Sequence, residues 1–473
     1  MTAQALPYGP AFGLGILIPV TLLLLVPLVV AARRAGSVAG AFVVVALWLR
    51  TTAGAYHLYM FQPLAGGLSG NALLSIAVTG FGLLFVVRPA NLALKWLLPV
   101  HALILLALLS ASLNGDLVGG INVAVKYAYM IVILIAAFQA LRRDPEARFL
   151  NWAMVSFLPL LVFQALSLAL NMPKGAEDGD GLVWIGGYNH EAAFSVALLT
   201  GFLVGGLARS APRAVRTAFL TLTLVAILLA GYRTTILALA PLALATFLGG
   251  LTMSVRRDQR GAMAVTATVA GVLLFAIAAL SYSQSFADLA AFLADPAALI
   301  KPPRDFDLLE RQVMSGRPLI WSSYIYAWAD GTPLQHLFGL GPESWEGVFK
   351  VYPHNTLVST LYELGWFGVA AMIALWTVMF AAAASARGDR FLLIAAHFAF
   401  FLLNMATMPF WQVEGLALYG LLCGYTVHTA RAARWGAAPT RDRLAYGISH
   451  FQDRRGPEKH HRASPRAAGA RRR

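Results

Sequence analysis

The amino-acid sequence predicts an all-α, polytopic integral membrane protein with about 12–13 transmembrane helices and one large external loop that contains short amphipathic helices. Of the 473 residues, 59% are hydrophobic and only 12% are charged, and the mean hydropathy is +0.68. Many uncharged runs approach the roughly 20 residues that a helix needs to cross the hydrocarbon core of a bilayer. These three observations exclude an ordinary soluble globular protein.

The apolar runs follow one another along the chain with short polar connections. The first run ends in Arg33-Arg34 and has no basic segment before it, so we expect a permanent span rather than a cleaved signal peptide. The one cysteine, Cys423, excludes an intramolecular disulfide and a cysteine-based metal site. The predicted spans are residues 11–32, 38–57, 71–87, 92–111, 120–141, 150–170, 190–208, 215–232, 234–251, 262–281, 355–384, 390–408 and 412–430.

Basic residues fall on alternate connections, which predicts the orientation because cytoplasmic loops are enriched in Lys and Arg. The N-terminus and a loop over about residues 282–353 then face outward, and residues 431–473 face the cytoplasm. The basic connections carry Arg33-Arg34, Arg88 with Lys95, Arg142-Arg143 with Arg148, Arg209 with Arg213 and Arg216, Arg256-Arg257 with Arg260, and Arg387 with Arg390.

The net charge of +14 is concentrated in the C-terminal tail. Residues 431–473 contain 12 Lys and Arg and 3 Asp and Glu, so they account for +9 of the total. A basic tail beside a last span is typical of a disordered cytoplasmic end that contacts anionic lipid. The charge therefore does not indicate a nucleic-acid partner, and the expected environment of residues 1–430 is the lipid bilayer.

The external loop is too long to be a simple connection. Ile320, Trp321, Tyr324 and Trp328 follow a helical spacing, which predicts an amphipathic helix on the outer membrane interface. Arg317 precedes Pro318 in the sequence, a pattern typical of a first helical turn, and the planar guanidinium of an arginine matches phosphate oxygens.

A histidine stands at the end of this loop. Pro353 ends an extended stretch, and His354-Asn355-Thr356 opens the next span. The dipole at a helix N-terminus favours the neutral imidazole, which is the form that a general base needs. A capping or interfacial histidine is the alternative interpretation of His354.

Three cations depart from the usual charge pattern of membrane helices. Arg50, Lys126 and Arg233 lie within or at the outer ends of predicted spans, where an uncompensated cation is costly. Each is a candidate for binding an anion, and a structural ion pair or a snorkelling side chain is the alternative. His190-Glu191, which opens the seventh span, is a further candidate for an acceptor site.

The order of these residues resembles the O-antigen ligase and polymerase superfamily of integral-membrane glycosyltransferases. The similarity covers about residues 233–368, whereas the earlier spans match only in hydropathy. In order, the motifs are Gly231-Tyr232-Arg233, Ser315-Gly316-Arg317 with Trp321, Leu340-Gly341, and His354-Asn355 with Leu357, Glu363, Leu364-Gly365 and Gly368.

The resemblance implies a transferase of the bacterial inner membrane that uses neither a metal nor another cofactor and whose active site faces the periplasm. It would pass a glycan from an undecaprenyl-diphosphate carrier to an acceptor hydroxyl of a glycolipid or glycan. Carried over by position, His354 is the general base, and Arg233 and Arg317 hold the diphosphate. Arg50, Lys126, His190, Glu191, Asn355 and Trp321 are candidates for the surrounding substrate or acceptor site.

Two alternatives remain open from the sequence. A polymerase of polysaccharide or exopolysaccharide repeat units would use the same site as a lipopolysaccharide O-antigen ligase. A polysaccharide or lipid transporter, or a flippase, belongs to another class and would place ionisable groups near the middle of the bilayer, often in a repeated half. The cations lie near the outer ends of the spans and no convincing repeat is visible, which favours the enzyme.

Overall fold

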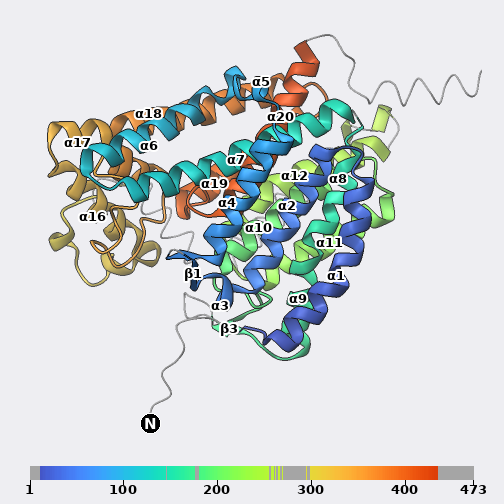
Figure 1. Cartoon of the computed structure of the whole chain (residues 1–473), viewed down its shortest axis with the longest axis horizontal. Helices are drawn as coiled ribbons and strands as arrows, with labels where there is room; N and C mark the ends of the chain where they lie inside the picture. Colours follow the sequence, from blue (N-terminus) through green and yellow to red (C-terminus); the bar gives the residue numbers. More distant parts are fainter. Residues whose placement is uncertain are drawn as a thin grey trace, which may run out of the picture.

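The computed structural model describes residues 11–434 except 66, 145, 176–180 and most of 255–298. The chain forms a bundle of helices, and α16 and α17 lie to one side of it, at the left in Figure 1. Two short hairpins, β1–β2 and β3–β4, lie near one end of the bundle. The elements are α1 (Leu14–Arg34), α2 (Val38–Ala55), α3 (His57–Met60), β1 (Pro63–Ala65), β2 (Leu68–Ser69), α4 (Gly70–Phe81) with a π-helical extension (Gly82–Val86), α5 (Pro89–Leu92), α6 (Leu98–Asn114), α7 (Leu117–Arg143), α8 (Arg148–Ala153), α9 (Leu158–Ala169), β3 (Lys174–Gly175), β4 (Leu182–Val183), α10 (Glu191–Leu207), α11 (Arg213–Leu229), α12 (Arg233–Ser254), α16 (Arg317–Ala329), α17 (Pro333–Phe338), α18 (Thr356–Ser385), α19 (Arg390–Ala406) and α20 (Val413–Arg434).

The prediction of a helical membrane protein is confirmed in its broad form. Among the described residues, seven helices are long and apolar enough to cross a membrane. Helix α1 also exposes large apolar side chains, with Leu23 73% and Val26 66% exposed, as expected of a surface that faces lipid. The seven are Leu14–Arg34, Val38–Ala55, Lys95–Asn114, Leu117–Arg143, Arg148–Ala169, Arg233–Gly250 and Thr356–Ser385.

The full count of about 12–13 spans stays a prediction. Three shorter apolar helices, Gly70–Val86, Glu191–Leu207 and Arg390–Ala406, coincide with further predicted spans. Helices α11 and α20 also coincide with predicted spans. The predicted span over residues 262–281, the first part of the external loop and almost all of the basic tail lie outside the described residues.

The basic connections gather at one end of the bundle, which we call the basic end. The Arg34 guanidinium lies 5.2 Å from the Trp152 ring, so the α1–α2 and α7–α8 connections are neighbours. Asn151 donates a hydrogen bond to the Ser210 hydroxyl at 2.9 Å, and Arg209 pairs with Asp389. The α10–α11 and α18–α19 turns therefore share this end, and α10, α12, α18 and α20 all begin at the opposite end.

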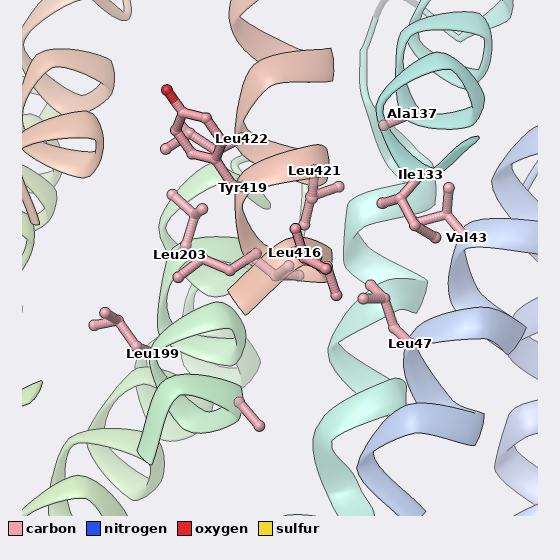
Figure 2. Close-up of a cluster of buried hydrophobic side chains, with 14 of the residues drawn as sticks. Val43, Leu47, Ile133, Ala137, Leu199, Leu203, Leu416, Tyr419, Leu421 and Leu422 are labelled. Carbon is pink, nitrogen blue, oxygen red and sulfur yellow. The ribbon is translucent and has the colours of Figure 1, made fainter. Parts of the chain in front are cut away.

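The centre of the bundle depends on close contact between α7 and α20. A Cβ atom on Gly420 would lie 2.7 Å from the Met130 carbonyl oxygen, and Gly424, one turn later, lies as tightly against the Leu134 carbonyl. Small residues four apart let two apolar helices approach closely within a membrane. Figure 2 shows leucines of α10 and α20 packing beside side chains of α2 and α7 in the core that results.

Candidate functional site

Helix α18 is interrupted beside the candidate site. Gly365 has φ 65° and ψ −162°, a conformation that only glycine adopts readily. A Cβ atom there would lie 2.5 Å from the Leu337 carbonyl carbon, so the end of α17 packs directly on this backbone. Gly339 approaches the Glu363 backbone equally closely from the other side. The predicted span over 355–384 is therefore one helix with an interruption that sequence periodicity did not indicate.

The residues after Gly339 bind to the turn that precedes this break. The Leu340 amide donates to the Tyr362 carbonyl at 2.8 Å, and the Gly341 amide donates to the Glu363 carbonyl at 3.2 Å. The Ser110 hydroxyl of α6 donates to the same Glu363 carbonyl at 2.8 Å. These bonds fix the segment 339–346 against α18 and α6.

Helix α16 holds the segment that leads to His354. The predicted helix is confirmed, and two of its aromatic side chains, Trp321 and Tyr324, are buried against the protein. The Trp321 indole donates to the Pro353 carbonyl at 2.9 Å, and the Tyr324 hydroxyl donates to the Val351 carbonyl at 2.9 Å. Tyr324 also stacks on Phe349, with ring centroids 4.0 Å apart. Trp321 therefore positions the residue directly before His354.

His354 lies outside α18 by two residues. Its backbone has φ 53°, a left-handed conformation that is uncommon for residues other than glycine and often marks functional sites. Asn355, and not His354, is the helix cap, and its side-chain oxygen accepts from the Leu357 and Val358 amides at 2.9 and 3.2 Å. The Asn355 amide group donates to the Met405 carbonyl at 3.2 Å. Asn355 thus ties His354 to the end of α19.

The Tyr352 ring lies against the imidazole, and two tryptophan rings lie against Tyr352. The His354 and Tyr352 ring centroids are 4.0 Å apart, and Tyr352 stacks on Trp411 at 5.5 Å. Trp345 meets both Tyr352 and Trp411 edge-on, at 6.3 and 5.8 Å. Lys126 places its ammonium 5.1 Å from the centroid of the Trp411 ring. Two predicted residues, His354 and Lys126, therefore belong to one cluster.

Lys126 also has an acidic partner in the segment between α17 and α18. Its Nζ lies 2.6 Å from Glu343 Oε1, and Asn122 donates to Glu343 Oε2 at 3.1 Å. Glu343 has a left-handed φ of 60°. Burial raises the pKa of the neighbouring Glu346, and the Glu343 carboxylate raises it further. The Glu343 carboxylate therefore compensates the charge of Lys126, which does not need an external anion.

Arg50 forms a buried ion pair. Its Nε and Nη2 donate to Glu414 Oε1 at 2.9 and 2.7 Å, and its Nη1 donates to the Asn71 side-chain oxygen. Arg50 and Glu414 are each only 6% exposed. The carboxylate comes from the first turn of α20, far along the chain from α2. This arrangement matches the structural alternative that the sequence left open for Arg50.

His190 and Glu191 lie at the predicted start of α10. His190 caps the helix, and its Nδ1 accepts from the Ala192 amide at 3.0 Å. Buried Glu191 pairs with Lys174 of the β3–β4 hairpin at 2.7 Å. Nearby, His57 Nδ1 donates to the Gly187 carbonyl at 2.7 Å, and burial lowers the pKa of His57. These contacts fasten the hairpin to the bundle.

The two predicted diphosphate ligands begin helices, as expected. Arg317 opens α16 after left-handed Gly316, and no ion pair or hydrogen bond joins its side chain to the described part of the chain. It precedes Trp321 by four residues, so the two side chains share one face of α16. Arg233 opens α12 at the end opposite the basic end, after the left-handed turn at Gly231.

The structure connects some of the predicted residues by direct contacts. Trp321, His354, Asn355 and Lys126 belong to one continuous set, whereas Arg50, His190 and Glu191 make separate structural contacts. Within the described part of the chain, no ion pair, hydrogen bond or ring contact joins Arg317 to His354. Two cavities, a narrow one beside Arg50 and one of about 400 Å³ at the α18–α19 turn, are lined by none of His354, Arg233 and Arg317.

Sequence reasoning missed four residues of this region: Glu343, Glu414, Tyr352 and Trp411. The spans of Arg50 and Lys126 contain few acidic residues, and the partners come instead from α20 and from the loop before α18. Tyr352, two residues before His354 in the sequence, was a signal that an aromatic ring could lie beside the imidazole. The chain matches no known family model and no curated protein sequence.

Proposed function

We propose that this protein is a glycosyltransferase of the bacterial inner membrane that passes a glycan from undecaprenyl diphosphate to an acceptor hydroxyl at the periplasmic face. The observation that carries the proposal is the setting of His354. It stands on a left-handed backbone directly before a membrane helix, with Trp321 and Asn355 fixing the residues on either side. Such strained positions, held by their surroundings, are concentrated at functional sites.

His354 acts as the general base in this proposal. Its Nδ1 is buried, so Nε2 is the nitrogen that faces the acceptor. The imidazole takes the proton of the acceptor hydroxyl while that oxygen forms a bond to the anomeric carbon. The bond from this carbon to the phosphate oxygen breaks, and undecaprenyl diphosphate leaves as an anion. A single displacement of this kind inverts the anomeric centre.

The arginines supply the charge that the leaving group requires. Arg317 has no carboxylate partner among the residues that the structure describes, and it shares a helix face with Trp321, which contacts Pro353. Arg233 starts α12 at the end of the bundle where α18 and α20 also begin. Guanidinium groups bind phosphate oxygens in a bidentate manner and stabilise the negative charge as it develops.

Site variants test these roles. We expect His354→Ala and Arg317→Ala to abolish transfer while the protein still inserts into the membrane. His336→Ala and Arg304→Ala are matched controls in the same loop, because the half-buried His336 contacts Trp328 and the Ala329 carbonyl, and Arg304 is 88% exposed. Full activity in either site variant removes that residue from the mechanism.

The reaction itself is tested with purified protein and a lipid-linked repeat unit. Transfer to added lipid A-core identifies a ligase, and a ladder of products without added core identifies a polymerase. Movement of the lipid-linked glycan across vesicle membranes with no new glycosidic bond would instead support the transporter and overturn the proposal.

A further inference from the structure

A stack of rings runs from the α19–α20 connection to His354. The Tyr352 ring lies 4.0 Å from the imidazole with an interplanar angle of 31°, and Trp411 lies 5.5 Å from Tyr352 at 21°. Trp345 closes one edge of this stack. Parallel offset contacts of this kind favour one relative orientation of the rings. The imidazole therefore has one face covered.

A charged pair lies at the far end of the stack. Lys126 Nζ is 5.1 Å from the Trp411 ring centroid and 2.6 Å from Glu343 Oε1. A cation over the face of a tryptophan is attracted by the ring quadrupole. Because Glu343 belongs to the segment that binds the α18 break, Lys126 connects α7, that segment and the ring stack. The contact restrains Trp411 between Lys126 and Tyr352.

Backbone contacts alone do not orient the imidazole ring. Trp321 and Asn355 fix the main chain on either side of His354. Contacts with the main chain do not restrain rotation about the side-chain bonds of His354. The ring stack restrains the imidazole itself, because Tyr352 lies directly against it. A general base needs this restraint, because a small misplacement of a reacting group greatly lowers the rate.

We infer that Tyr352, Trp411 and Lys126 are positioning residues that orient the His354 imidazole through the ring stack. The inference rests on the proposed function, which assigns proton transfer to His354. It gives Lys126 a role different from substrate binding, because its ammonium is occupied by Glu343 and Trp411. It also predicts that the acceptor hydroxyl approaches Nε2 in the plane of the ring, since Tyr352 covers one face.

Paired leucine and phenylalanine variants test the stack. We expect Tyr352→Leu and Trp411→Leu to lower kcat by about ten-fold or more, because the base is misoriented, with KM for the lipid-linked donor unchanged. Tyr352→Phe and Trp411→Phe keep a flat ring and should retain most of kcat. Trp366→Leu is the matched control, because Trp366 is 54% exposed and contacts Trp328 outside the stack.

Lys126 is tested by a double-mutant comparison. Lys126→Met should lower kcat, and adding it to Trp411→Leu should lower kcat no further, because both changes act through one stack. Additive losses would show that Lys126 acts elsewhere. A rise in donor KM with Lys126→Met alone would assign it to substrate binding and overturn its positioning role.

A readout independent of activity separates this inference from the proposed function. Carbethoxylation of His354 by diethyl pyrocarbonate, followed by peptide mass spectrometry, reports how freely the imidazole reacts. We expect faster modification in Tyr352→Leu and wild-type rates in Tyr352→Phe and Trp366→Leu. An unchanged rate of His354 modification in Tyr352→Leu would overturn the inference that the ring stack orients the imidazole. Full transfer by His354→Ala would overturn only the proposed base while leaving the modification result intact.

Discussion

Gly365→Ala should destabilise the protein far more than an ordinary glycine substitution. Gly365 interrupts α18 at φ 65° and ψ −162°, and the end of α17 packs against it without an intervening side chain. The added methyl group would lie 2.5 Å from the Leu337 carbonyl carbon and 2.6 Å from the Phe338 amide nitrogen. Because both neighbours are backbone atoms, the overlap is relieved only if α17 moves away.

The expected cost has two parts. Holding alanine in a conformation that only glycine tolerates costs about 1–3 kcal/mol. Moving α17 and the residues after it breaks the Leu340–Tyr362 and Gly341–Glu363 backbone hydrogen bonds, each of which contributes about 0.5–1.5 kcal/mol. The free energy of unfolding should therefore fall by about 2–6 kcal/mol.

Two further glycines separate these parts. Gly347 has φ 79° but nothing within 4 Å of an added Cβ, so Gly347→Ala measures backbone strain alone, about 1–2 kcal/mol. Gly80 lies within α4 and has equal space, so Gly80→Ala should be neutral or stabilise by up to about 1 kcal/mol. The midpoint of SDS-induced unfolding in mixed micelles ranks the three variants. Equal midpoints for Gly365→Ala and Gly347→Ala would refute the close packing of α17 on α18.

Two other predictions concern buried polar groups. Arg50→Met should destabilise the protein by about 3–5 kcal/mol, because it leaves the Glu414 carboxylate buried without its cation, and Arg50→Met with Glu414→Leu should recover most of this loss in SDS unfolding. Recovered stability without recovered transfer would assign Arg50 to substrate binding. Burial lowers the pKa of His57 below its ordinary 6.5, so the folded state prefers the neutral ring, and stability should fall as the pH drops below 6.5. His57→Gln can still donate to Gly187 and should flatten this decline in thermal unfolding scans, and an unchanged pH profile would contradict the assignment.

The sequence predicted the helix starts well because their signals are local. Arg317 before Pro318, His354-Asn355-Thr356 and His190 before Glu191 each fall where the structure begins a helix. Local patterns do not indicate which distant groups meet. The predicted span 355–384 appeared continuous in the sequence. The break at Gly365 accompanies a close contact with the end of α17, and local sequence patterns do not reveal such a contact.

The partners of the membrane cations show the same limit. The sequence marked Arg50 and Lys126 as charges that need compensation, but their partners Glu414 and Glu343 lie 364 and 217 residues away in the sequence. Charge neutrality required an acid near each cation, and only the fold determines which acid. The glycines Gly420 and Gly424 carried a signal that was available, a small-residue pair typical of close helix contact.

The way in which each cation is compensated bears on its function. Arg50 and Lys126 each pair with a carboxylate from another element, so their charges stabilise the arrangement of α2, α7, α20 and the segment between α17 and α18. Arg317 differs, because it has no carboxylate partner within the described part of the chain although it shares a helix face with Trp321. A half-buried arginine that the fold does not neutralise favours an anion from outside the protein. For this reason, a prenyl diphosphate should protect Arg317 from arginine-specific modification and leave Arg50 unaffected.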